Sequence, residues 1–589
     1  MIKTPLPPVD KHLAVPAAEA GHAPSSAVLD SAHIGDIQGA FGTVRLNEAG
    51  STTRSSWKTR IKTLLAIIGP GLIVMVGDND AGAFGTYTQA GQNYGTGLLW
   101  TLLLLVPVLF LYVNQEMVLR LGVVTGVGHA RLILERFGKF WGAFSAIDLF
   151  ILNALTIVTE FIGISIGLDY LGVPKIPGVI VAALVVVGAA STGSFKTFER
   201  VCLTLVAGSL LLVPVFFMSS PDYGQMAHDF VVPGFPAGSD VADVTLLIIA
   251  IVGTTIAPWQ LFFQQSYVID KRITPRYMKY ERVDLWIGIA IVILGAAAII
   301  SFTAFTFAGR PEFGQFTDAG GVAEGLGKYV GHLAGILFAL ALIDASIIGA
   351  AAVGLSTSYA FGDVLGLKHS LHRKVRDAKG FYAAFAAVIL VAAVIVIIPG
   401  SPLGLLTVGV QVLAGVLLPS ATVFLLLLCN DKQVMGPWVN GRAMNLFTSA
   451  VIAVLVILSV VLTAAVLFPD IDAATILAIL GVGAGLTVLT GVGLAVAHLV
   501  RRAAPSGAGT AATHDGEAAP AVVRSAAESE GGRAATRAQR LTWRMPPLAL
   551  LERPQLSATR RIGLSVLRLY LLVAMILVVV RVVQLALGG

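Results

Sequence analysis

Charged residues are scarce in this sequence. Asp, Glu, Lys and Arg together make up 13% of the 589 residues, whereas soluble domains carry about 25%. The chain has only two cysteines, Cys202 and Cys429, and both lie in apolar runs. That excludes a disulfide scaffold and a metal site of the CxxC type. The formal net charge of +6 is weak for so long a chain and does not indicate a nucleic-acid partner.

Apolar residues are correspondingly abundant. They make up 56% of the sequence, and the mean hydropathy is +0.83. A run of about 20 apolar residues crosses a bilayer as a helix, because lipid offers the backbone no other hydrogen-bonding partner. We therefore expect an all-α polytopic protein of the cell membrane, with the lipid bilayer as its surroundings. About 13 hydrophobic segments are predicted, at roughly 62–90, 96–119, 141–168, 177–195, 200–219, 243–270, 284–308, 331–360, 380–399, 402–428, 446–467, 474–500 and 562–586.

The loops between these spans predict the orientation of the chain. If the N-terminus is cytoplasmic, the loops on the cytoplasmic side carry an excess of Lys and Arg, as the positive-inside rule requires. Residues 1–60 are polar and rich in Pro, Ala and Ser, so we expect a disordered cytoplasmic N-terminus and no signal peptide. Residues 501–560 are expected to be a disordered cytoplasmic linker. Residues 562–586 contain two arginines, and this C-terminal hydrophobic helix is expected either to span the membrane or to lie along its interface.

The first span contains carboxylates and glycines where lipid would require apolar residues. In GPGLIVMVGDNDAGAFG, residues 69–85, the apolar run gives way to Gly77, Asp78, Asn79 and Asp80. Carboxylates at membrane depth usually mark a functional site. We therefore expect Asp78 and Asp80 to face a polar cavity that accepts a cationic substrate.

The sixth span is interrupted as well. Its sequence, IVGTTIAPWQLFFQQ at residues 251–265, contains Gly253 and Pro258, and a proline removes a backbone hydrogen bond inside a helix. The two interrupted spans are five spans apart, so they enter the membrane from opposite sides. This pattern is typical of an inverted repeat that holds its substrate between two unwound segments.

Several motifs resemble the Nramp family of divalent-metal transporters over about residues 60–470. Asp80 to Ala83 stand where that family has Asp-Pro-Gly-Asn, and Ile256 to Gln260 stand where it has Met-Pro-His-Asn. Further similar motifs are RLGVVTG at 120–126, VQVLAGVLLPSA at 410–421 and NDKQVMG at 430–436. The resemblance implies a leucine-transporter-type fold, in which residues 61–220 and 241–430 form two inverted five-helix repeats and residues 445–500 add further transmembrane helices.

The resemblance also implies a site. Asp80 and Gln411 stand at positions of metal ligands in the family, and Asp78 is a carboxylate that the family does not have there. The cavity and the helix breaks are expected to include Gly82, Pro258, Trp259 and Gln260. No cofactor is expected, because the metal ion is the transported substrate.

The departures from the family pattern bear on selectivity. Ala83 replaces the metal-binding asparagine and Ala257 the metal-binding methionine, while Trp259 and Gln264 replace two histidines. A thioether favours soft transition metals, so its loss leaves a wider site with oxygen ligands only, which suits an ion such as Mg²⁺ that keeps several waters. The pattern resembles the Nramp-related magnesium transporters, whose transport is passive. The aspartate of the family's proton path is Ile157 here, which also agrees with passive transport.

Individual residues have other interpretations. Asp80 could cap a half-helix, Asp78 could lie behind the ligands or at the pore entrance, and Gln411 could form an interhelical hydrogen bond. Glu160 could carry protons or be a buried structural acid. Asp148 and Asp344 lie within or near spans and have no predicted role.

Three functions follow from these interpretations. The main expectation is a secondary transporter that moves Mg²⁺, with Mn²⁺ as a further candidate ion, passively by alternating access. The alternative is a proton-coupled Mn²⁺ or Fe²⁺ transporter that uses Glu160 and Asp78. A second alternative is a transporter of a cationic organic solute on the same fold. An enzyme is not expected, since no nucleophile–base pair or nucleotide motif stands out.

Overall fold

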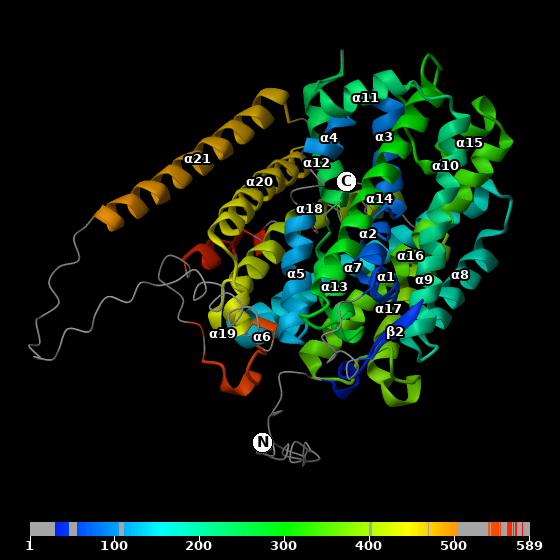
Figure 1. The fold of residues 1–589 in the computed structure, drawn as a ribbon. Helices are drawn as coiled ribbons and strands as arrows, with labels where there is room; N and C mark the ends of the chain where they lie inside the picture. Colours follow the sequence, from blue (N-terminus) through cyan, green and yellow to red (C-terminus); the bar gives the residue numbers. More distant parts are fainter. Residues whose placement is uncertain are drawn as a thin grey trace, which may run out of the picture.

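A computed structural model describes residues 30–45, 56–104, 111–236, 238–255, 257–399, 403–468 and 471–503, and parts of 540–580. Within these residues the chain is helical apart from one two-stranded sheet (Figure 1). Eight of the described helices are long and apolar enough to cross a membrane, or ten if each of two bent pairs counts as one span. The prediction of an all-α polytopic membrane protein is confirmed.

The two longest helices pack against each other at the centre of the molecule. They are α7 (Lys139–Tyr170) and α16 (His332–Leu365). Glycines allow the close approach: a Cβ added to Gly167 of α7 would lie 2.6 Å from Cγ1 of Ile343, and one added to Gly349 of α16 would lie 2.8 Å from the carboxyl carbon of Glu160. Small residues at such contacts are typical of helix packing in membranes.

Both predicted interruptions are present. The first span consists of α2 (Pro70–Val76) and α3 (Ala81–Tyr94), separated by residues 77–80. The sixth consists of α12 (Val241–Thr255) and α13 (Pro258–Asp270), in which Pro258 is the first helical residue. Proline is favoured at that position because the missing N–H would have no helical partner. The long helix α14 (Met278–Phe307) packs against both α2 and α3 and so supports the first break from one side.

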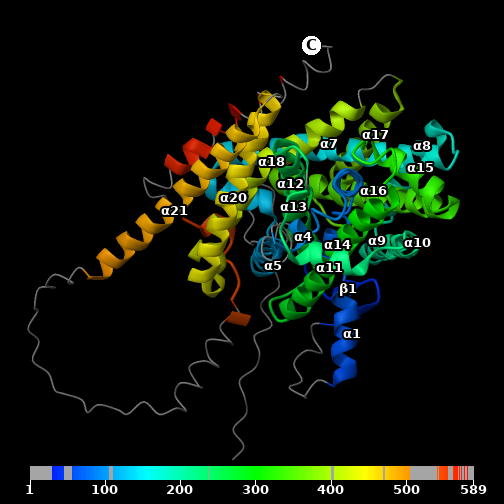
Figure 2. The ribbon, with the colours of Figure 1, turned by 90° about the horizontal axis from the view of Figure 1, so that it is seen from above.

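The other helices surround this centre. Two of them form a bent pair, α5 (Tyr112–Thr125) and α6 (His129–Phe137), with a bend of 78°. Figures 1 and 2 show α21 (Ala473–Ala503) at one edge of the molecule, beside α20 (Arg442–Leu467). The other long or apolar helices are α8 (Lys175–Ala190), α9 (Phe195–Gly208), which continues into α10 (Leu212–Met218), α17 (Lys379–Ile397) and α18 (Leu403–Cys429). The shorter helices are α1 (Trp57–Ile67), α4 (Trp100–Leu104), α11 (Tyr223–Val231), α15 (Ala319–Tyr329) and α19 (Lys432–Met435).

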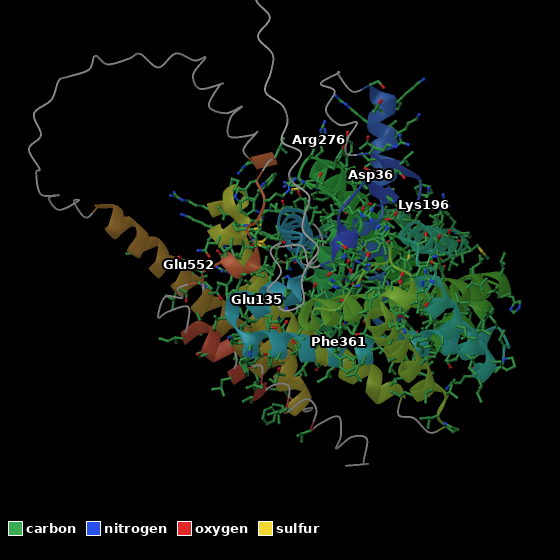
Figure 3. The ribbon with its side chains drawn as sticks, turned by 90° about the horizontal axis from the view of Figure 1, so that it is seen from below. Asp36, Glu135, Lys196, Arg276, Phe361 and Glu552 are labelled. Atoms are coloured by element: carbon green, nitrogen blue, oxygen red, sulfur yellow. The ribbon has the colours of Figure 1, made fainter. Side chains whose placement is uncertain are left out.

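The expectation of a disordered N-terminal segment does not hold for residues 30–45. These residues form a short 3-10 turn (Ser31–His33) and a hairpin of β1 (Ile37–Gly39) and β2 (Gly42–Val44). Figure 3 views this end of the molecule and labels Asp36 of the segment together with Lys196 and Arg276. The segment is ordered because distant loops bind it: Arg272 Nε donates to Ala32 O at 2.9 Å. A stretch rich in Pro, Ala and Ser can thus contain a short ordered element.

The expected linker at 501–560 is also ordered in part. Residues 504–539 lie outside the described residues, but residues 543–552 pack against the rest of the chain, with Met545 and Leu548 buried. The backbone oxygen of Glu552, labelled in Figure 3, accepts a hydrogen bond from Arg136 at 2.5 Å. Beyond it, the hydroxyl of Tyr570 lies 2.6 Å from that of Ser459 on α20, so the described part of the last hydrophobic segment contacts that helix.

Candidate functional site

Carboxylates hold the start of α3 at the first break. Asp80 is the N-cap residue, and its Oδ1 accepts a hydrogen bond from Ala83 N at 3.0 Å. Glu160 Oε2, from α7, accepts one from Ala81 N at 3.2 Å. Backbone donors in the first turn of a helix have no helical partners, so both bonds satisfy groups that would otherwise be buried unpaired. The capping role considered for Asp80 is therefore real, and it uses only one carboxylate oxygen.

Asp80 and Glu160 bind the same turn of α3. Asp80 Oδ1 accepts from Ala83 N and Glu160 Oε2 accepts from Ala81 N, so charge on one carboxyl group affects the other. The second Glu160 oxygen, Oε1, is buried without a hydrogen-bond partner in the described part of the chain. Glu160 thus joins α7 to the break in the first span and can respond to charge at Asp80.

Asp78 lies in the same break and faces α13. Its Oδ1 accepts a short hydrogen bond from Gln260 Nε2, and its Oδ2 is buried with no partner among the described residues. Asp80 is close enough for the two charges to interact. Asp78, a carboxylate that the family pattern does not include, therefore lies buried in the first break beside Asp80 and is not confined to a pore entrance.

The two breaks also meet through other side chains. The Trp259 ring lies against Gly77, since a Cβ added at Gly77 would be 3.7 Å from Trp259 Cη2. Tyr87 of α3 and Thr255 of α12 share a hydrogen bond of 2.9 Å. The predicted cavity residues Gly82, Pro258, Trp259 and Gln260 are all buried here.

The electrostatics of this centre favour a cation. No Lys or Arg in the described part of the chain pairs with Asp78, Asp80 or Glu160, although all three are buried. The positive end of the α3 dipole offsets part of their charge. Buried carboxylates need a partner, a proton or a metal ion. The described residues contain no group of three or more His, Cys, Asp or Glu side chains placed to hold a metal ion, so protein carboxylates alone do not form a complete metal cage.

The other residues predicted at the metal site are Ala83, Ala257 and Gln411. Ala83 is fully buried in the first turn of α3, and Ala257 is the half-buried residue before Pro258. Gln411 lies in α18, but its side chain falls outside the described residues.

The two acids without a predicted role have different surroundings. Asp148 is buried on α7 and one of its oxygens, Oδ1, has no partner in the described part. Asp344 lines an apolar cavity of about 370 Å³, together with Asn79 and residues of α10 and α14.

Sequence reasoning missed Gln115 and Tyr87. Gln115 Nε2 donates to Gln260 Oε1 at 3.0 Å, which places it one hydrogen bond behind the residue that binds Asp78. A signal was present, because Asn114, Gln115 and Glu116 are three consecutive polar residues inside an apolar span. Tyr87 gave no such signal, since hydroxyl side chains are common in membrane helices.

Comparison with known proteins gives consistent matches. The family described as natural resistance-associated macrophage protein-like, Nramp, matches residues 71–465. The divalent metal cation transporter MntH of Ralstonia nicotianae is 30% identical over 410 residues, which cover 66% of this chain and 88% of that protein. MntH of Pectobacterium carotovorum is 27% identical over 426 residues, covering 70% and 96%.

A solved structure supports the fold. The Eremococcus coleocola manganese transporter, in complex with an aromatic bis-isothiourea substituted compound, aligns with a TM-score of 0.56 at 22% identity. The alignment covers 77% of this chain and 97% of that one. This likeness and the two broken spans identify the fold as the leucine-transporter type.

Proposed function

The chain belongs to the Nramp family of divalent-metal transporters, and we propose that it carries Mn²⁺ through the breaks in its first and sixth spans. In this proposal Asp80 is the main carboxylate ligand and Asp78 a second one. Gln411 and backbone oxygens at the breaks would complete the set. Carboxylate, carbonyl and water oxygens suit Mn²⁺ as well as Mg²⁺. The single observation that carries the proposal is the pair of buried carboxylates without a basic partner between two interrupted helices.

The names of the relatives support Mn²⁺ better than the expected Mg²⁺. The curated relatives are called divalent metal cation transporters, and the structural neighbour is called a manganese transporter. Glu160 supports movement of a proton with the metal: it is a buried acid that binds the same helix turn as Asp80, so a cation at Asp80 would favour release of a proton from Glu160.

Passive transport of Mg²⁺ remains a second candidate, because one specific observation favours it. Ala83 and Ala257 provide no side-chain ligand where the family has asparagine and methionine. A site without thioether and imidazole gives no preference for transition metals, and the missing bulk leaves room for water on the ion. In this candidate the N-terminus is cytoplasmic, as in the first.

Uptake into proteoliposomes tests the proposal. The vesicles contain fluorophores for Mn²⁺ or Mg²⁺ and a pH dye, and wild type is compared with Asp80→Asn and with Asp169→Asn. Asparagine caps a helix about as well as aspartate, so Asp80→Asn removes the charge and keeps the cap. We expect Mn²⁺ entry with acidification in wild type, a loss of about tenfold or more in Asp80→Asn, and no change in the exposed control Asp169→Asn.

Other results would decide between the candidates. Mg²⁺ entry without acidification would favour passive magnesium transport. If neither cation enters, or if Asp80→Asn transports as well as wild type, the proposed site is wrong.

A further inference from the structure

A row of two amides leads away from Asp78 into the space between α5 and α13. Gln260 Nε2 donates to Asp78 Oδ1, and Gln115 Nε2 donates to Gln260 Oε1 at 3.0 Å. All three side chains are buried: Asp78 is 1% exposed, and Gln260 and Gln115 are 0% exposed. Gln260 belongs to α13 and Gln115 to α5, so the row joins the first break to two different helices.

The direction of the hydrogen bonds in this row follows from its first member. A carboxylate oxygen can only accept, so Gln260 must turn its NH₂ group toward Asp78 and its oxygen toward Gln115. Gln115 must then donate, which leaves its own oxygen at the far end. That atom, Gln115 Oε1, is buried and has no partner among the described residues. The structure therefore holds the row in a single polarity, with a free acceptor at its far end.

A cation at Asp78 would reverse this polarity. The NH₂ group of Gln260 carries partial positive charge and occupies one of the two carboxylate oxygens, so in this orientation it competes with a metal ion. A half-turn of the amide about its terminal torsion, which has a broad energy profile, brings Gln260 Oε1 to the cation. Hard divalent cations accept the side-chain amide oxygens of Asn and Gln as ligands.

The reversal has to pass to the second amide. Once Gln260 presents its oxygen to the cation, its NH₂ group faces Gln115, and two NH₂ groups cannot hydrogen-bond to each other. Gln115 must then turn its oxygen toward Gln260, and its NH₂ group points to the far end of the row. Occupancy of Asp78 is thereby transmitted to α5, a helix with no residue in the break.

We propose that Gln260 and Gln115 form a reversible amide pair that closes the empty site and supplies an oxygen ligand to the bound cation. Gln260 is the ligand, and Gln115 is a positioning residue that acts through Gln260. The proposal rests on the proposed function, because it requires a divalent cation at Asp78. It adds a neutral, directional ligand whose orientation differs between the empty and the occupied site.

Calorimetric titration of the purified full-length protein with Mn²⁺ tests the pair. The variants are Gln260→Leu, Gln115→Leu and the double variant, with Gln265→Leu as a matched control. Gln265 lies on the same helix, is fully buried, and bonds to Val127 O and His129, not to Asp78. Circular dichroism and the unfolding temperature identify any variant that does not fold.

We expect Gln260→Leu to raise the Kd for Mn²⁺ about tenfold, since a hydrogen bond or ligand bond to a charged group is lost. Gln115→Leu alone should raise the Kd about threefold. Added to Gln260→Leu, it should cause no further rise in the Kd, because Gln115 acts only through Gln260. A residue that merely supports packing would weaken binding in both backgrounds. Gln265→Leu should leave the Kd within about twofold.

Failures of the two proposals are distinguishable. If wild type binds neither Mn²⁺ nor Mg²⁺, the proposed function is wrong and the pair has no cation to sense. If wild type binds Mn²⁺ and the folded Gln260→Leu variant binds it equally well, the amide pair is wrong and the proposed function stands. The pair is equally wrong if the effects of the two substitutions simply multiply in the double variant.

Discussion

Ala83 and Ala257 stand at two positions where the family binds metal with side chains. In this chain neither side chain can coordinate an ion, and Ala83 donates its N–H to Asp80. In the proposed site, oxygen ligands from the carboxylates, amides, backbone and water would have to distinguish one cation from another. Oxygen ligands alone separate Mg²⁺ from Mn²⁺ poorly, so selectivity should be sensitive to what these two positions hold.

Restoring the family residues tests this argument. We expect Ala83→Asn together with Ala257→Met to raise the ratio of Mn²⁺ to Mg²⁺ uptake about tenfold, because the thioether adds a soft ligand and the added bulk excludes water. The measurement is competitive uptake in proteoliposomes. Ala250→Met, a half-buried position in α12 away from the break, is the control and should leave the ratio unchanged. An unchanged ratio in the double variant would mean that these positions do not determine selectivity.

At this scale the sequence indicated the charged residues of the first break better than the neutral residues around them. Asp80 and Asp78 could be predicted because charge at membrane depth is unusual. Gln260 was expected only as a cavity residue, and Gln115 was not expected at all. An amide costs less to bury than a carboxylate, and its sequence position does not show which neighbour it faces.

At the scale of helices, buried polar groups fix the start of the first span. Asp284 Oδ2, from α14, accepts hydrogen bonds from Gly69 N at 3.1 Å and Gly71 N at 2.7 Å, so it caps α2 from outside. Gly69 has a φ of 151°, a conformation open chiefly to glycine, and Pro70 then begins α2. The chain bends by 50° here, between α1 and α2.

This bend lies inside the stretch predicted as a single span, 62–90. The Gly69–Pro70 pair is a recognised turn signal, but the apolar residues on both sides concealed it. The breaks at 77–80 and 256–258 were predictable because carboxylates or a proline interrupt the pattern there. The residue that caps α2 at the bend could not be predicted, because Asp284 is more than 200 residues away from Gly69 in the sequence.

A buried ion pair joins this region to α9 and α13. Lys271 Nζ lies 2.6 Å from Glu199 Oε1 and donates to Ile68 O at 2.9 Å, and both charged side chains are fully buried. Glu199 Oε2 also accepts a hydrogen bond of 2.6 Å from Ala40 N in the N-terminal hairpin. One pair thus connects four separate elements around the start of α2.

Breaking this pair should be costly. We expect Lys271→Met to lower the free energy of unfolding by about 3–5 kcal/mol, because Glu199 is left buried and unpaired. The double variant Lys271→Met with Glu199→Gln should recover part of the loss, since the amide can still accept from Ala40. Unfolding by sodium dodecyl sulfate titration measures the change. Lys279→Met, an exposed lysine nearby, should stay within about 0.5 kcal/mol of wild type. Equal losses in the two single lysine variants would contradict the ion-pair argument.

At the scale of the whole molecule, the N-terminal segment connects loops that are distant in the sequence. Asp30 accepts hydrogen bonds from His369 N at 3.0 Å and from Arg373 Nε at 2.9 Å. His33 Nε2 lies 3.0 Å from His369 O. Residues 30–45 therefore bind the loop between α16 and α17 as well as α9 and α13. Composition averaged over residues 1–60 could not show this, because the order comes from contacts more than 300 residues away.

The ionisation of these groups is set by their partners. Burial opposes ionisation of Asp30, but the hydrogen bonds from Arg373 outweigh it and lower the pKa to about 2. Burial likewise opposes protonation of His369, but the Asp363 carboxylate outweighs it and raises the pKa of His369 to about 9. The geometry agrees, since Nδ1 of His369 faces Leu367 O at 2.6 Å and Nε2 faces Asp363 Oδ1 at 3.1 Å. Both ring nitrogens donate, so this histidine is a cation.

The sign of the pH dependence follows from the direction of this shift. The folded pKa of His369, about 9, lies above the ordinary value of 6.5. Its contribution to stability is therefore complete below pH 6.5 and is lost as the pH rises through 9. Burial lowers the pKa of His33 and of His372, so these neutral histidines reduce stability only on the acid side of 6.5. Among these groups, only His369 changes its contribution to stability above pH 6.5, and Asp30 stays ionised over that range.

Thermal unfolding of wild type and His369→Gln between pH 6 and pH 10 tests the ion pair of His369 with Asp363 of α16. At pH 6 we expect wild type to be more stable by up to about 3 kcal/mol, the free energy equivalent to the pKa shift. The difference should shrink as the pH approaches 10, because wild type loses the charge that the variant never had. His332→Gln, an exposed histidine at the start of α16, should parallel wild type across the range. A difference between wild type and His369→Gln that stays constant with pH would mean that packing of the imidazole, and not its charge, holds the loop after α16 in place.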